Sequence, residues 1–159
     1  MKKTKTITQG DNAFDFQLKD QNGKTFRLSK MKGKRVLLSF HPLAWTSVCA
    51  KQMKSLEKSK KRFDAMNAVA VGISVDSVPC KNAWAKSLGV NATRLLSDFW
   101  PHGGVAQQYG LFRDHDGFAG RANILVDEDQ RVIFIKIYPI LQLPDIEEIF
   151  QVLETTTKK

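Results

Sequence analysis

Short segments in which apolar and polar residues alternate lie near the start of the chain and predict a β-hairpin. Residues 15–18 and 25–28 alternate in this way, and the pair Asn22-Gly23 lies between them. Asn-Gly between two alternating segments is a strong short-range signal for a hairpin turn. The N-terminal part is therefore predicted to form two antiparallel strands.

Two apolar runs, residues 35–40 and 69–75, are typical of strands that are buried on both faces. Between them, Met53, Leu56, Phe63 and Met66 recur at steps of three and seven residues, and the lysines of this segment lie on the other side of the helix. This spacing predicts one helix over 47–66 with an apolar inner face and a basic outer face. The resulting β-α-β order implies a right-handed parallel crossover.

The second half of the chain predicts further strands and helices around the same sheet. Asp76-Ser77 can cap a helix that ends at Gly89, and Pro144 suits the first turn of a final helix. The elements expected are a helix body at 81–88, a loop-rich stretch at 90–120 with a short helix at 105–109, strands at 122–126 and 132–138, and a helix at 144–153. We therefore expect an α/β fold, with a mixed central sheet flanked by helices on both faces and an N-terminal β-hairpin extension.

The length of 159 residues predicts a single domain over residues 1–159. The basic start has no apolar core behind it, and no apolar run is long enough to cross a bilayer, so we expect no secretory signal, no membrane partner and a cytoplasmic location. The two cysteines, Cys49 and Cys80, are too few for a disulfide scaffold or a four-cysteine zinc site. They can form one redox pair, or one reactive thiol and a bystander.

Positive charge is concentrated in the first half of the chain. The net charge is +9, from 25 basic and 16 acidic residues, and much of the excess lies in residues 1–35 and 51–66. One interpretation is a surface that binds polyanions. The other is a solvated helix face and a basic N-terminal arm, which we favour because neither a nucleic-acid motif nor interleaved aromatic residues accompany the lysines. No nucleic-acid partner is expected.

Cys49 lies where the predicted central strand gives way to a helix. The first turn of a helix has N–H groups without intrahelical partners and the positive end of the helix dipole, and both favour a thiolate. Thr46, three residues earlier, is close enough for its hydroxyl to reach the sulfur or a bound oxygen, and Pro42 removes a backbone donor at the end of the strand. The alternative is a buried cysteine that only packs in a helix.

The pattern Pro42-x-x-x-Thr46-x-x-Cys49 resembles the active-site motif of peroxiredoxins, the thiol-dependent peroxidases. The resemblance extends over about residues 9–153, although Ala13 stands where the family often has proline. The other similar segments are residues 10–18, Gly33-Lys34, residues 74–77, Ala83-Trp84 and residues 96–98. This resemblance implies a thioredoxin-like fold.

The same resemblance implies a role for each matched residue. Cys49 would be the peroxidatic cysteine, which attacks peroxide and becomes a sulfenic acid, and Thr46 would hydrogen-bond the attacked oxygens. Arg121 would stabilise both the thiolate and the developing negative charge, and Gln52 could orient Arg121. The implied partners are a peroxide substrate, an external thiol reductant such as a thioredoxin-like protein, and a second copy in a homodimer; no haem, flavin or other cofactor is needed.

The resolution of the sulfenic acid remains open at the level of sequence. Cys80 matches the region of a resolving cysteine in some peroxiredoxins, but not its position, so it either forms a disulfide with Cys49 or is a packed thiol while an external thiol reduces Cys49. His41, next to Pro42, could line the site, although a single histidine at the end of a strand more often only packs. His102 and His115 are interpreted as structural and loop residues, and the three histidines predict no metal site. The alternatives to a peroxidase are a redox sensor or thiol-disulfide relay that uses Cys49, and a basic binding module without catalysis.

Overall fold

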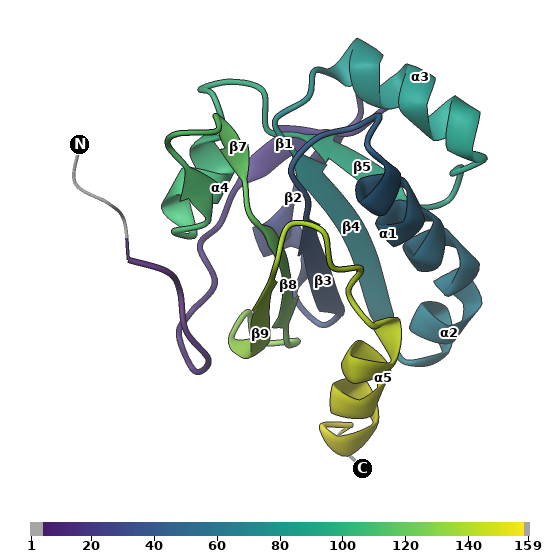
Figure 1. Ribbon diagram of the computed structural model, residues 1–159. Coiled ribbons are helices and arrows are strands. Elements are labelled where there is room, and N and C mark those ends of the chain that lie inside the picture. The colour runs from purple at the N-terminus through teal and green to yellow at the C-terminus, as the bar shows by residue number, and fades with distance from the viewer. Residues whose placement is uncertain (1–4, 158–159) are drawn as a thin grey trace.

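The apolar run at 35–40 forms the strand β3 (Arg35–Phe40), in which all six residues are buried. The computed structural model describes residues 5–157 (Figure 1). Its other strands are β1 (Gln17–Lys19), β2 (Thr25–Arg27), β4 (Ala68–Ser74), β5 (Arg94–Ser97), β6 (Phe112–Arg113), β7 (Phe118–Ala119), β8 (Arg121–Val126) and β9 (Val132–Tyr138). Its helices are α1 (Ser47–Lys58), α2 (Lys60–Ala65), α3 (Val78–Leu88), α4 (Gly104–Gln108) and α5 (Ile146–Thr155), with a 3-10 turn at Leu28–Met31.

The main sheet is mixed, as the sequence predicts. Within residues 5–157 its strand order is β2-β1-β5-β4-β3-β8-β9. The strand β4 pairs in parallel with β3 and β5, whereas β8 pairs antiparallel with β3 and β9. The predicted hairpin, β1 and β2, extends the sheet through one antiparallel pairing between Lys19 and Ser97.

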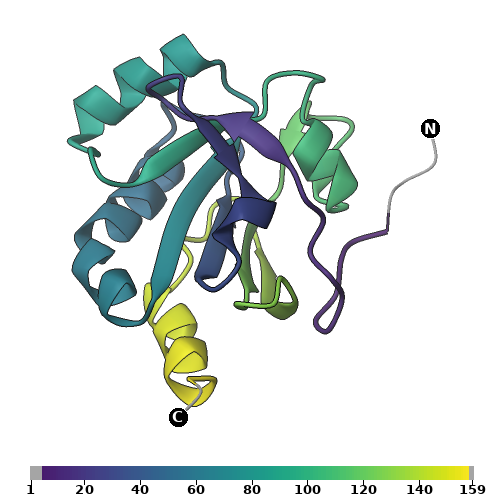
Figure 2. The same cartoon turned by 180° about the vertical axis from the view of Figure 1, so that it is seen from behind.

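The side chains of β3 alternate between two hydrophobic clusters, one on each face of the sheet. Val36 and Leu38 pack with Tyr109 on the face that α4 and the N-terminal segment cover, whereas Leu37 packs with Met53 on the opposite face. Helices α1, α2, α3 and α5 contribute to this second cluster, and the two opposite views show the helices on both sides of the sheet (Figure 1, Figure 2). The candidate cysteine Cys49 belongs to the second cluster.

The helix predicted over 47–66 is divided at Ser59 into α1 and α2. The N–H of Ser59 is shared between the carbonyls of Ser55 and Leu56, at 3.2 Å each, so the regular hydrogen bonding is tightened there. Serine is a weak helix former in an interior position, and Ser59 is itself buried. The prediction of a continuous helix was therefore wrong at this residue, although the apolar face that it placed inside is buried.

The stretch predicted as loop-rich, residues 90–120, contains three short strands. The strand β5 has buried residues at both Leu95 and Leu96, so it lacks the alternation that marks a strand with one exposed face. The strands β6 and β7 have two residues each and form a separate two-stranded antiparallel sheet. Segments this short carry too little periodicity to be distinguished from loops.

The predicted basic helix face is on the surface. Lys51, Lys54, Lys58 and Lys61 are exposed, and Arg62 pairs with Glu147 at 2.6 Å. Residues 1–4 of the predicted basic arm lie outside the described residues. Among residues 5–157, no helix combines the length and the apolar character that crossing a membrane requires.

Asp98 is a buried carboxylate that follows β5 and caps the short helix α4. Its two oxygens accept the N–H groups of Val105 and Ala106 at 3.0 Å each, and its side chain is almost completely removed from solvent. Burial raises the pKa of Asp98 from 3.8 to about 6, although these N–H groups and the charge of Lys81 act in the opposite direction. The folded chain therefore binds a proton at Asp98 at pH values at which the unfolded chain does not.

We predict that this carboxylate makes stability fall as pH rises from about 4 to about 6. A raised pKa in the folded state gives stabilisation that is complete below the unfolded pKa and is lost as pH rises through the folded pKa. Relative to Asp98→Asn, which does not titrate, the wild type should lose about 2 to 3 kcal/mol of unfolding free energy across this window. Urea unfolding of both proteins at several pH values measures the difference, and a difference that is constant with pH would contradict the prediction.

Candidate active site

Cys49 is the third residue of α1 and lies directly after the loop that follows β3. The residue before the helix, Thr46, has extended backbone angles, and its carbonyl accepts the N–H of Ala50 at 2.9 Å. The Cys49 side chain has no exposed surface. It is a free thiol beside the first-turn N–H groups, where the helix dipole favours negative charge.

Arg121 contacts the sulfur of Cys49. This arginine begins β8, is 2% exposed, and its Nη1 donates to Cys49 Sγ at 3.3 Å. The same nitrogen donates to Gln52 Oε1 at 2.7 Å, and Nε and Nη2 donate to the Ile140 carbonyl at 2.9 and 2.7 Å. The guanidinium plane is therefore fixed from two sides while one N–H points at the sulfur.

Gln52 connects this arginine to the central strand. It lies three residues after Cys49 in α1, and its Nε2 donates to Ser39 Oγ at 2.7 Å and to the Phe40 carbonyl at 3.3 Å. The hydroxyl of Ser39 in turn donates to Asn123 Oδ1 at 2.8 Å, across the paired strands β3 and β8. Each donor in this series has an acceptor, so the orientation of the Gln52 amide and of Arg121 is determined.

Two other residues of the sequence motif lie in the loop before α1. Pro42 is buried, directly after His41 at the end of β3. Thr46 is exposed, and its hydroxyl donates to the Leu43 carbonyl at 2.8 Å instead of pointing its proton at the sulfur.

Cys80 lies in the first turn of α3, and it is linked to the loop that precedes Cys49. Its Sγ donates to Asp76 Oδ1 at 3.7 Å, while the other oxygen of Asp76 accepts the N–H of Ala44 at 2.8 Å. The side chain of Trp45 also acts on the Cys80 sulfur as a hydrogen-bond donor. Burial and the negative charge of Asp76 raise the pKa of Cys80.

Comparison with known proteins gives a consistent family assignment. The model of the AhpC/TSA family matches residues 9–135. The chain is 39% identical over 132 residues to alkyl hydroperoxide reductase E of Mycobacterium tuberculosis, with 82% of this chain and 86% of the relative covered. It is 30% identical to peroxiredoxin 2 of Thermoplasma acidophilum, over 91% of this chain and 74% of the relative.

The chain belongs to the AhpC/TSA family and is a peroxiredoxin. A solved structure of peroxidoxin BcpB from Mycobacterium tuberculosis has a TM-score of 0.84 at 28% identity and covers 96% of this chain, which in turn covers 99% of that chain. The reduced 2-Cys peroxiredoxin of Plasmodium vivax has a TM-score of 0.82 at 26% identity, over 92% of this chain and 80% of that one. These matches confirm the thioredoxin-like fold and the family that the sequence motif indicates.

Sequence analysis of this peroxiredoxin missed a buried pair beside the site, Lys81 and His41. Lys81 Nζ and His41 Nε2 are 2.9 Å apart, and both side chains are completely buried. The helical spacing of α3 could have placed Lys81 on the same face as Trp84 and Ala85, which are also buried. The other two histidines, His102 and His115, are exposed. Among residues 5–157, no group of three or more histidine, cysteine or acidic side chains could hold a metal ion.

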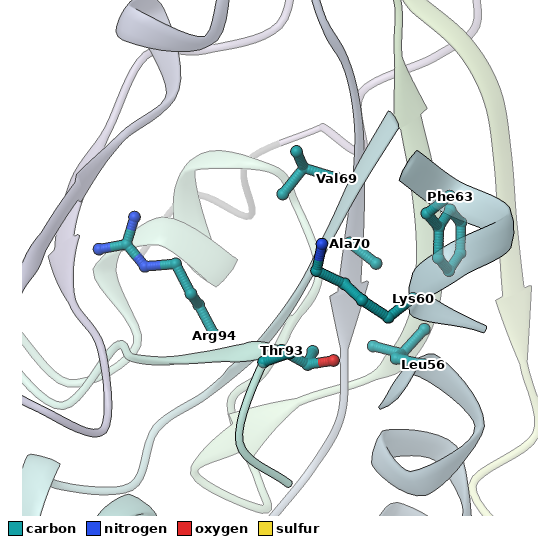
Figure 3. Close-up of a pocket in the computed structure, with 8 residues that line it drawn as sticks. Leu56, Lys60, Phe63, Val69, Ala70, Thr93 and Arg94 are labelled. Carbon is teal, nitrogen blue, oxygen red and sulfur yellow. The ribbon is translucent and has the colours of Figure 1, made fainter. Parts of the chain in front are cut away.

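A small pocket lies elsewhere on this peroxiredoxin, between the α1–α2 region and strands β4 and β5 (Figure 3). Its two cationic groups, Lys60 and Arg94, are paired with Asp64 and Asp20 respectively. The residues that line it are Leu56, Lys60, Phe63, Val69, Ala70, Ala92, Thr93 and Arg94. The pocket therefore includes neither cysteine nor Arg121.

We predict that Gln52→Met destabilises the fold because it removes two buried hydrogen-bonding groups. The substitution removes the 2.7 Å acceptor of Arg121 Nη1 and the donor to Ser39 Oγ, although Nη1 keeps its contact with Cys49 Sγ and Ser39 keeps its bond to Asn123, at a cost of about 1 to 3 kcal/mol. Urea unfolding measures this loss, and Lys51→Met, at an exposed position of the same helix, is the matched control. Equal stability of the Gln52 variant and the wild type would show that the network contributes nothing.

Proposed function

We propose that this protein is a thiol-dependent peroxidase that reduces hydrogen peroxide and small organic hydroperoxides, with Cys49 as the peroxidatic cysteine. The observation that carries the proposal is the buried contact of 3.3 Å between Arg121 Nη1 and Cys49 Sγ at the start of α1. A cation and a helix N-terminus on one sulfur favour the thiolate, which is the nucleophilic form of cysteine. The complete burial of Cys49 supports small peroxides over bulky ones.

In the first step, the Cys49 thiolate attacks the terminal oxygen of the peroxide. A sulfur–oxygen bond forms while the oxygen–oxygen bond breaks, so the sulfur loses two electrons and the peroxide gains them. The departing oxygen takes up a proton and leaves as water or an alcohol, and Cys49 becomes a sulfenic acid. The thiol supplies both electrons, so the step needs no additional redox cofactor.

Arg121 is the residue best situated to stabilise the charge that moves during this step. Negative charge passes from the sulfur to the departing oxygen, and a fixed guanidinium next to the sulfur can interact with both. Gln52 holds Arg121 at 2.7 Å, which keeps its N–H groups directed. Thr46 would bind the peroxide oxygens through its hydroxyl or backbone, and Pro42, which has no N–H, shields the sulfur.

Cys80 is proposed as the resolving cysteine. A Cys80 thiolate would attack the sulfenic sulfur of Cys49, forming a disulfide and releasing the sulfenic oxygen as water. The support for this role is that Asp76 bonds both Cys80 Sγ and Ala44 N, in the loop before Cys49. Because Cys49 is buried within α1, the two helix starts would have to loosen locally before a disulfide could form.

The partners follow from membership of the family. We propose that a thioredoxin-like protein returns two electrons to the Cys49–Cys80 disulfide, and that the protein acts as a homodimer of a single-domain chain. A redox relay that uses the same cysteine would differ by forming a stable mixed disulfide with a partner and by poor turnover.

We predict that Cys49→Ser abolishes the reaction with peroxide, because a serine hydroxyl is not ionised at neutral pH. Stopped-flow tryptophan fluorescence after mixing with hydrogen peroxide follows the first step. Cys80→Ser is the matched control and should retain a fast first phase, since Cys80 acts only after it. A Cys49→Ser protein that reacts as fast as the wild type would refute the peroxidase proposal, and a wild type that reacts once without turnover in the presence of a thioredoxin system would favour the relay.

We predict that the mass of the peroxide-treated protein, measured under denaturing, non-reducing conditions, shows whether Cys80 resolves the sulfenic acid. The wild type should lose two hydrogens through an intramolecular disulfide, whereas Cys80→Ser should gain one or more oxygens on Cys49. A wild type that gains oxygen instead would remove Cys80 from the mechanism, and Cys49 would then be reduced by an external thiol.

A further inference from the structure

Lys81 and His41 form a buried pair that the proposed reaction does not use. Lys81 lies in the first half of α3 and His41 directly after β3, and neither side chain has exposed surface. Their nitrogens Nζ and Nε2 are 2.9 Å apart. A lysine is rarely fully buried unless its charge has a function or a partner.

The direction of this hydrogen bond follows from the surroundings of His41. Its Nδ1 lies 3.3 Å from the Ser39 carbonyl, which can only accept, so Nδ1 carries the proton and Nε2 is the acceptor. Burial and the positive charges of Lys81 and Arg121 hold the pKa of His41 well below 6.5, so the ring is neutral. Lys81 is therefore the donor, and its ammonium is held by a neutral group.

The pair lies against the helix that carries Cys49. A methyl group built on Gly72 of β4 would meet both Met53 Sδ and His41 Cε1, so these two side chains lie beside one another over the strand. Met53 is one helical turn after Cys49 and belongs to the same cluster as Cys49 and Trp84. Lys81 Nζ lies 5.4 Å from the centre of the Trp84 ring.

The charges that face Lys81 come from four segments. Burial lowers the pKa of Lys81 to about 8, and the negative forms of Asp76, Cys49, Cys80 and Asp98 act in the opposite direction. Among the described residues no carboxylate lies within ion-pair distance of its Nζ, and the hydrogen bond that holds it is to neutral His41. The positive charge of Lys81 is therefore not neutralised by a carboxylate in contact with it.

We propose that Lys81, oriented by His41, is a second buried cation of the active site and acts as a positioning residue that favours the thiolate of Cys49. Arg121 contacts the sulfur directly, whereas Lys81 acts through space from the side of α3. The interaction is reciprocal: a thiolate at Cys49 favours the ammonium form of Lys81, and the ammonium favours the thiolate by the same free energy. The inference rests on the proposed function only in assuming that Cys49 works as a thiolate.

The competing explanation is that Lys81 and His41 only fill space in the core. Replacement of a buried charge by an apolar side chain of similar shape is often neutral or stabilising, so a purely packed lysine would be exchanged for methionine without any change in cysteine chemistry. The two explanations therefore predict different pH midpoints for the ionisation of Cys49, whereas the stability of the variants does not distinguish them.

The test measures thiolate formation at Cys49 directly. In a Cys80→Ser background Cys49 is the sole cysteine, and the ultraviolet absorbance of the thiolate gives the pH midpoint of its ionisation without any peroxide. Lys81→Met should move this midpoint upward by about 0.5 to 1 pH unit, and should slow the peroxide reaction below the midpoint by about threefold to tenfold. Lys86→Met, at an exposed position of the same helix, is the matched control and should move neither.

A second variant keeps the test decisive if Lys81→Met does not fold. His41→Phe retains a ring against Trp84 but removes the acceptor of Lys81, so the ammonium becomes less favourable and the midpoint should move in the same direction. Midpoints that coincide with that of the parent in the folded variants would overturn the proposal, whatever their melting temperatures. A shifted midpoint in a protein that does not react with peroxide would instead refute the peroxidase function and leave this inference standing.

Discussion

A buried guanidinium must have its N–H groups paired, and the architecture of the site follows from meeting this demand at Arg121. Its partners come from separate parts of the chain: the sulfur of Cys49 and the amide of Gln52 from α1, and the carbonyl of Ile140 from the segment after β9. Cys49 and Gln52 are 72 and 69 residues from Arg121 in sequence, and Ile140 is 19 residues away. The arginine therefore has its partners only when strand β8, helix α1 and the β9–α5 connection are packed together, which ties formation of the site to formation of the fold.

Further charged groups with little access to water lie on both faces of the sheet. Lys81 and Asp98 are both buried, and His41 remains neutral between cations. Such an arrangement costs stability, as the shifted pKa values of Lys81 and Asp98 indicate, and natural proteins commonly retain this cost at functional sites. The opposite face, which packs around Tyr109, holds mainly apolar side chains, and Asp98 is buried against the helix α4 that covers it.

Much of the architecture could be predicted because its signals are local. The continuous apolar run of β3 and the Asn22-Gly23 turn each depend on a few neighbouring residues, and both elements form as expected. The motif around Cys49 likewise lies within one short segment. The division of the helix at Ser59 and the strand β5 were missed, because the first depends on a shared hydrogen bond and the second on burial of both its faces.

The site itself was predicted unevenly for a related reason. Arg121 and Gln52 were inferred through resemblance to a family, since no local pattern connects residues so far apart in sequence. Lys81 and His41 were not connected at all, because a lysine in a helix and a histidine after a strand ordinarily face solvent or pack singly. Their pairing arises from the tertiary approach of α3 to the end of β3, which neither periodicity nor composition encodes.

The Asp76 carboxylate joins two segments that the proposed chemistry would require to move. One oxygen holds the amide of Ala44 in the loop before Cys49, and the other holds the thiol of Cys80 at the start of α3. The hydroxyl of Ser74 in β4 also donates to the oxygen that holds Ala44, at 2.5 Å, so the loop and the helix start share one anchor on the sheet. Rotation of the Asp76 carboxylate would therefore release both segments together, which couples local opening around one sulfur to opening around the other.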